Sequence, residues 1–170
     1  MQLIPSVEPT LGMRPLLLIS VLAWVGAVSE FDKYPAEARL VGKPAAVNLS
    51  LPDARRFRTM LRTEAVQGPN FNGHYRIAYW GQGTGAVMWA VIDLSTGVVW
   101  FSADNAGIGM CAGADLKDDG LEYFEHRIDS ALLYVHTCNG KYPMNRVFNT
   151  RDVYVWQKGA ATLMREESIK

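Results

Sequence analysis

Apolar and polar residues alternate at 74–80, and short apolar segments bounded by turn residues recur after it, a pattern that predicts β-strands. Residues 86–92 are apolar almost without interruption, which is typical of a strand buried on both faces. Turn sequences such as DLSTG at 93–97 and KG at 158–159 separate successive strands, so the strands pair as antiparallel hairpins. The predicted strands are, in chain order, residues 74–80, 86–92, 98–101, 121–128, 131–135, 152–156 and 161–164.

One helix is predicted ahead of these strands, and residues 45–49 predict a short first strand. Pro52 suits the first helical turn, and Asp53 favours the positive end of the helix dipole. Gly68 and Pro69 end the helix. Its apolar residues share one stripe: Ala54, Phe57, Leu61 and Ala65. The expected fold class is α+β, a curved antiparallel β meander of three hairpins with one short helix packed on it.

Residues 1–29 have the pattern of a signal peptide. Arg14 precedes an uncharged apolar stretch that is too short for a comfortable membrane span of about 20 residues. Small residues before Glu30 fit cleavage there, and Met13 offers a second start for translation. We expect a single β-rich domain at 30–170, periplasmic or secreted, with no stable membrane span after cleavage. Retention of the signal as an anchor is the alternative.

The two cysteines, Cys111 and Cys138, both lie in the predicted mature domain. An even number of cysteines in an oxidising compartment favours a disulfide between them. The bond would close a loop of about 27 residues and stabilise the fold by roughly 3–4 kcal/mol on the chain-entropy description. Two separate buried thiols are the alternative, and neither cysteine has the spacing of a zinc ligand.

The charge of the chain is balanced, with 17 basic and 17 acidic residues. Proteins that bind nucleic acid usually carry a basic excess or stripe, so we expect no nucleic-acid partner. We interpret the arginines of the predicted helix as its solvated face, with an anionic partner as the alternative: Arg55, Arg56, Arg58 and Arg62. No metal or cofactor is expected, because the three histidines lack the spacing of a ligand set.

Glycine and aromatic residues are most concentrated in three segments, NFNGHY at 70–75, WGQGT at 80–84 and DLSTG at 93–97. These segments resemble a family of small exported bacterial proteins with no settled function, which carry N-F-x-G-H-Y, W-G-x-G-T and D-x-x-T-G. The resemblance implies an exported domain and assigns no reaction. The chain departs from the family at Gln82, where a cysteine is common.

The predicted binding residues come from these segments: Asn70, His74, Tyr75, Trp80, Gln82 and Thr84. Gly73 is expected to take a positive φ. His74 has the chemistry of a general base or a ligand, although a hydrogen bond to a loop carbonyl is the favoured interpretation. Asp93 is expected to accept hydrogen bonds within its own turn. His126 and His136 are expected to form a polar cross-strand pair on the solvent face, with a paired histidine site as the alternative.

Small size, export and an aromatic-rich sheet favour binding over catalysis, and no serine lies on a G-x-S-x-G nucleophile elbow. We expect an exported binding module, such as an inhibitor or immunity-type protein acting on a partner protein in the cell envelope. A small envelope hydrolase or ligand-binding enzyme using His74 with Asp93 is the alternative, and a structural envelope protein is a third. The site is expected around residues 70–85 and a long loop at 103–120.

Overall fold

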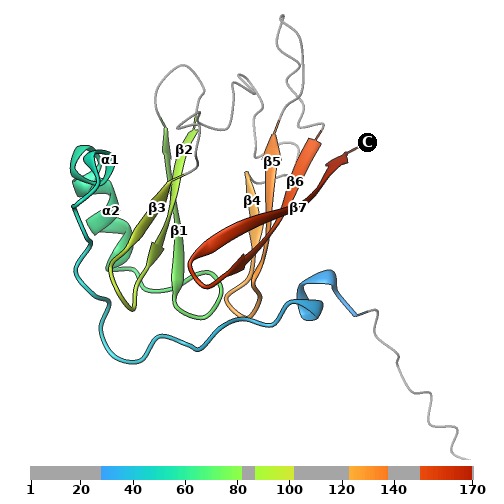
Figure 1. The fold of residues 1–170 in the computed structure, drawn as a ribbon, viewed down its shortest axis with the longest axis horizontal. Coiled ribbons are helices and arrows are strands. Elements are labelled where there is room, and N and C mark those ends of the chain that lie inside the picture. The colour runs from blue at the N-terminus through green and yellow to red at the C-terminus, as the bar shows by residue number, and fades with distance from the viewer. Residues whose placement is uncertain (1–27, 82–86, 102–122, 138–149, 170) are drawn as a thin grey trace, which may run out of the picture.

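The computed structural model describes residues 28–81, 87–101, 123–137 and 150–169. These ranges contain a 3-10 helix, η1 (Glu30–Lys33), and two α-helices, α1 (Pro52–Arg56) and α2 (Arg58–Ala65). The strands are β1 (Tyr75–Gly81), β2 (Val87–Asp93), β3 (Val99–Phe101), β4 (Phe124–His126), β5 (Leu132–Thr137), β6 (Thr150–Gln157) and β7 (Ala160–Ser168). They form two antiparallel sheets, β1-β2-β3 and β4-β5-β6-β7, with α1 and α2 beside the first (Figure 1).

Two tight turns have the backbone that their sequences predict. Between β2 and β3, the Asp93 carboxylate accepts hydrogen bonds from Ser95 N at 2.8 Å and from Thr96 Oγ1 at 2.7 Å. This is the side-chain turn expected of an aspartate at that position. Lys158 and Gly159 have φ of 52° and 75°, the pair of positive values whose twist suits a two-residue hairpin. The two turns set the registers of β2 with β3 and of β6 with β7.

The apolar side chains form three layers, because successive residues of a strand point to opposite faces. The first layer lies between α2 and the first sheet and contains Leu61, Trp80 and Ile92. The second layer is shared by the two sheets and contains Ile77 and Trp156. The third covers the far side of the second sheet, where aromatic residues in and just after η1 pack.

Residues 34–49, which we call the strap, run along one end of both sheets (Figure 1). The strap is held by backbone hydrogen bonds to three turns at that end: Ala36 N to Asp129 O at 3.1 Å, Leu40 N to Gly73 O at 3.1 Å and Asn48 N to Gly97 O at 2.8 Å. The strap therefore ties the turns of the two sheets together. The first strand predicted at 45–49 is wrong, because these residues bond to turns and not along a strand.

The α+β class, the antiparallel pairing and the helix packed on a sheet are confirmed. Two details differ from the sequence prediction. The strands divide into two sheets that share a core, and the helix is interrupted at Phe57, which has φ −99° and ψ 18°. The ring of Phe57 lies 5.0 Å from that of Trp80 and 6.4 Å from that of Phe101, so the interruption serves packing on the first sheet.

The predicted solvent-exposed pair of His126 and His136 is wrong. In the register of β4 with β5, His126 lies opposite Leu133. The His136 side chain is only 1% exposed, and its Nε2 lies 3.0 Å from Glu125 Oε1. Because β5 is flanked by β4 and β6 and covered on both faces, its alternation does not mark a solvent side.

Several sequence predictions lie outside the described residues: the signal up to residue 27, Gln82, Thr84, the loop at 103–120, and both cysteines of the expected disulfide, Cys111 and Cys138. Within the described ranges, no helix combines the length and apolar character that crossing a membrane requires.

Candidate functional site

A short loop, residues 70–73, lies between the outer edges of β1 and β4, and we call it the spacer loop. On the β1 side, Phe71 exchanges backbone hydrogen bonds with Tyr75 at 3.0 and 3.1 Å. On the β4 side, Gly73 N donates to Ile128 O at 2.7 Å, just after the end of that strand. A single stretch of chain thus bonds to both sheets at this end of the molecule.

Asn70 also contacts both edges, at Ile77 of β1 and at His126 of β4. Its side-chain amide accepts a hydrogen bond from Ile77 N at 2.8 Å and donates one to Ile77 O at 3.1 Å. Its backbone oxygen lies 3.1 Å from His126 Nδ1. A carbonyl can only accept, so Nδ1 of His126 carries the hydrogen in this contact. The edges of the two sheets are therefore joined as far as Ile77 and His126.

Beyond this point the described residues leave the edge of β1 unpaired. In an antiparallel pair, alternate residues direct both backbone groups to the same side of the strand. Tyr75 and Ile77 direct theirs away from β2, toward the spacer loop, so Tyr79 directs its groups the same way. Among the described residues, none forms a hydrogen bond with the backbone N–H or C=O of Tyr79 on this side.

The edge of β4 is arranged in the same way. Tyr123 O accepts the backbone N–H of His136 at 2.9 Å, so this position faces β5. By alternation, the backbone groups of Phe124 face away from β5, toward the β1 side. No described residue pairs with these groups of Phe124.

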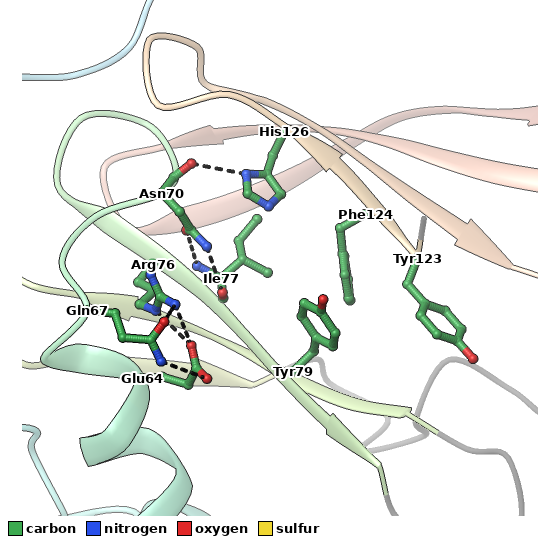
Figure 2. Close-up of a pocket in the computed structure, with 9 residues that line it drawn as sticks. All are labelled: Glu64, Gln67, Asn70, Arg76, Ile77, Tyr79, Tyr123, Phe124 and His126. Atoms are coloured by element: carbon green, nitrogen blue, oxygen red, sulfur yellow. Dashed lines mark hydrogen bonds and ion pairs between the residues drawn. The ribbon is translucent and has the colours of Figure 1, made fainter. Parts of the chain in front are cut away.

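An open cleft of about 430 Å³ follows this part of the β1 edge. Figure 2 shows Glu64 and Gln67 from the α2 side on one flank and Tyr123, Phe124 and His126 on the other. Tyr79 is 55% exposed, and its ring centroid lies 5.5 Å from that of Phe124. The cleft therefore has a strand edge along its length and an aromatic wall on the β4 side.

The polar wall of the cleft is already paired within the fold. Arg76 Nη2 lies 2.7 Å from Glu64 Oε2 and donates to Gln67 Oε1 at 2.6 Å. Its Nη1 donates to Gly68 O at 3.0 Å. The guanidinium is fixed between the helix end and β1, and its charge is neutralised by the Glu64 carboxylate. The cleft consequently offers little net charge to a ligand.

The second cluster of interest surrounds His74, where the strap packs against the turn that precedes β1. Its Nδ1 lies 2.8 Å from Ala38 O, which confirms the expected hydrogen bond to a loop carbonyl. Its Nε2 lies 3.7 Å from Asp93 Oδ1 and 3.9 Å from Glu37 Oε2. The structure thus brings His74 and Asp93 together, as the enzyme alternative requires, and adds Glu37.

The chemistry of this cluster is dominated by structural contacts. Burial opposes ionisation of Asp93, but hydrogen bonds from Ser95 and Thr96 outweigh it and lower its pKa. Burial raises the pKa of Tyr75, whose ring lies 4.1 Å from the His74 ring. Gly73 has φ +79° as expected, and a Cβ there would lie 2.5 Å from the backbone oxygen of Glu37. The strap is therefore closely packed against this cluster.

The predicted binding residues divide among three places. Asn70 lines the cleft. His74 and Tyr75 lie together under the strap, and the hydroxyl of Tyr75 is 3.5 Å from Glu37 Oε2. Trp80 is 8% exposed and lies in the core beneath the helices. The four predicted binding residues that the structure describes therefore do not form one site.

The aromatic residues of the cleft were missed by sequence analysis. Tyr79 continues the alternation of Tyr75 and Ile77 in the predicted strand 74–80, so the sequence pattern does not distinguish it from them. Tyr75 and Ile77 are buried between the sheets, whereas Tyr79 extends past the shared core. Tyr79 differs from them because the core that the two sheets share does not extend to its side chain, and this depends on the assembly of the sheets and not on the sequence of β1.

Comparison of the chain with protein-family models, curated proteins and solved structures finds no match. In the described ranges, no group of His, Cys, Asp and Glu is arranged to hold a metal ion. The assignment of the site rests on its own geometry.

Proposed function

We propose that this protein is an exported binding module, of the inhibitor or immunity type, that holds a partner protein of the cell envelope in the cleft between β1 and β4. The observation that carries the proposal is Tyr79, which is 55% exposed, packs against Phe124 and belongs to a strand edge that no described residue pairs with at this position. Export and the Cys111–Cys138 disulfide are part of the same proposal.

The composition of the cleft supports a protein partner. Tyrosine is enriched among the residues that dominate binding energy at protein interfaces, because it combines a large apolar ring with a polar end. Arg76 and Glu64 neutralise each other, so no charge in this pair has to lose its hydration without a partner when the cleft is covered. The rings of Tyr79 and Phe124, together with the paired Arg76 and Glu64, are therefore suited to a protein–protein contact from which water is excluded.

The enzyme alternative has a specific observation in its favour, the approach of His74 to Asp93. Two contacts speak against a catalytic pair. The Nδ1–H of His74 donates to Ala38 O and not to a carboxylate. The carboxylates of Glu37 and Asp93 both lie next to Nε2, the atom that a substrate would have to reach. Asp93 accepts hydrogen bonds from Ser95 and Thr96 through both of its oxygens. These contacts favour a structural role for His74, which holds the strap against the first sheet, over a role as general base.

Site-specific photo-crosslinking in intact cells tests the proposal. A benzophenone amino acid replaces Tyr79, and the matched control carries it at Leu163, which is 54% exposed on β7. The expected result is a discrete cross-linked partner protein at position 79 and none at position 163. The same products at both positions, or none at position 79, would contradict a partner in the cleft. Hydrolysis of a panel of esters and amides that is lost in His74→Asn would support the enzyme instead.

A further inference from the structure

We propose that the occupant of the cleft is an extended peptide segment of the partner, which adds as a strand to the open edge of β1. This inference rests on the proposed function and names the form in which the partner is recognised. In this mode, backbone hydrogen bonds supply affinity, and side chains at alternate positions supply specificity.

The first argument is that the protein already places one stretch of its own chain between the same two edges. The spacer loop bonds to Tyr75 of β1 through Phe71 and to Ile128 beyond β4 through Gly73. The spacer loop is itself a turn, with positive φ at Asn72 and Gly73, and it shows that the two edges are close enough at this end for one stretch of chain to bond to both. At Ile77, the next residue of β1 whose backbone groups face away from β2, the side-chain amide of Asn70 takes the place of a neighbouring strand. It provides the donor and the acceptor that such a strand would offer to Ile77.

The second argument is the continuation of both edges beyond the spacer loop. The next outward-facing residue of β1 is Tyr79, and Phe124 faces outward on β4. Unpaired strand edges are templates for pairing with another chain. The cleft of about 430 Å³ lies along this stretch and is lined at one end by Asn70, the first residue of the spacer loop.

The third argument concerns the side chains of the guest. In an extended segment, every second side chain would face the rings of Tyr79 and Phe124, which lie 5.5 Å apart. Arg76 is held by Glu64, so the cleft gives no charge for an acidic or basic guest side chain to pair with. The expected guest is an uncharged segment with apolar or aromatic residues at alternate positions.

The experiment uses the full mature chain and a display library of random 12-residue peptides, from which binders are selected and their dissociation constants measured. Tyr79→Ala removes the ring and keeps the backbone N–H, whereas Tyr79→Pro removes both. Proline is tolerated at a strand edge where the N–H points away from the ladder, so both variants are expected to fold. A second series of peptides carries one N-methyl group at each position in turn, and this series does not depend on the folding of any variant.

Main-chain pairing predicts that Tyr79→Pro binds a selected peptide roughly three- to tenfold more weakly than Tyr79→Ala, the effect of about one hydrogen bond. N-methylation should weaken binding at every second peptide position only. Equal affinities of the two variants together with no alternation in the N-methyl series would overturn the strand-addition inference, and so would a library that yields no binder. Peptides whose affinity is unchanged by Tyr79→Ala would instead count against the cleft itself, and with it the proposed function.

Discussion

Replacement of Asn70 by alanine tests how the edge of β1 is maintained. The substitution removes the two hydrogen bonds that the side chain makes with Ile77, at 2.8 and 3.1 Å. Each such bond contributes roughly 0.5–1.5 kcal/mol to stability, so their combined loss is about 1–3 kcal/mol. Because the open cleft admits water that replaces part of the lost pairing, we expect the lower part of this range, about 1–2 kcal/mol. That corresponds to a fall in Tm of roughly 3–6 °C for a domain of this size.

The assay is denaturant and thermal unfolding of Asn70→Ala beside a matched control, Asn48→Ala. Asn48 also accepts a backbone hydrogen bond, from Ser50 N at 2.9 Å, but on an exposed turn, where its loss should cost about 0.5 kcal/mol or less. Asn70→Asp should not restore stability at neutral pH, because it places a carboxylate oxygen against Ile77 O. An Asn70→Ala protein as stable as the control, or full rescue by aspartate, would refute the account of this edge.

Three further predictions concern the rest of the fold. Gly73→Ala should lower the free energy of unfolding by more than Gly68→Ala, because both have positive φ but only at Gly73 would the new Cβ meet backbone, Glu37 O at 2.5 Å; equal midpoints in urea would contradict this. Trp80→Ala should cost about 3–5 kcal/mol by opening a cavity beneath the helices; a loss under about 1 kcal/mol would show that Trp80 is not a core residue. The hydrogen bond from Arg165, and then that from Tyr134, lowers the pKa of Glu30 below its ordinary value of 4.5. The ionised Glu30 carboxylate should therefore contribute its full stabilisation above pH 4.5, and this contribution should be lost as the pH falls through the lowered pKa. Glu30→Gln should therefore reduce stability at pH 7 but not well below pH 4.5, and an equal effect at both pH values would argue against the Glu30–Arg165 pair.

The sequence predicted the elements of this fold better than their assembly. Period-two alternation and the turn at 158–159 located most of the strands, because these signals are local in the chain. The division into two sheets depends on the spacer loop, whose bonds to Ile128 and His126 join residues far apart in the sequence. No local pattern contains that information.

The candidate site was only partly accessible to sequence analysis for the same reason. Asn70 was selected because it stands in a distinctive segment, and it does line the cleft. Trp80 came from an equally distinctive segment but packs in the core, since its side chain faces the helices. Tyr79 and Phe124 look like ordinary strand aromatics, and their role depends on two strands that meet only in the folded protein.

The central claim is that the edge of β1 beyond Asn70 is open in the free protein and becomes paired when the cleft is occupied. Residue-resolved amide hydrogen exchange measures this directly, with Ile77 as an internal reference because its N–H already bonds to Asn70. The account predicts that the Tyr79 amide exchanges much faster than the Ile77 amide in the free protein and becomes protected in the complex with the cross-linked partner. A Tyr79 amide that is as slow as Ile77 without a partner, or that is unchanged in the complex, would contradict it.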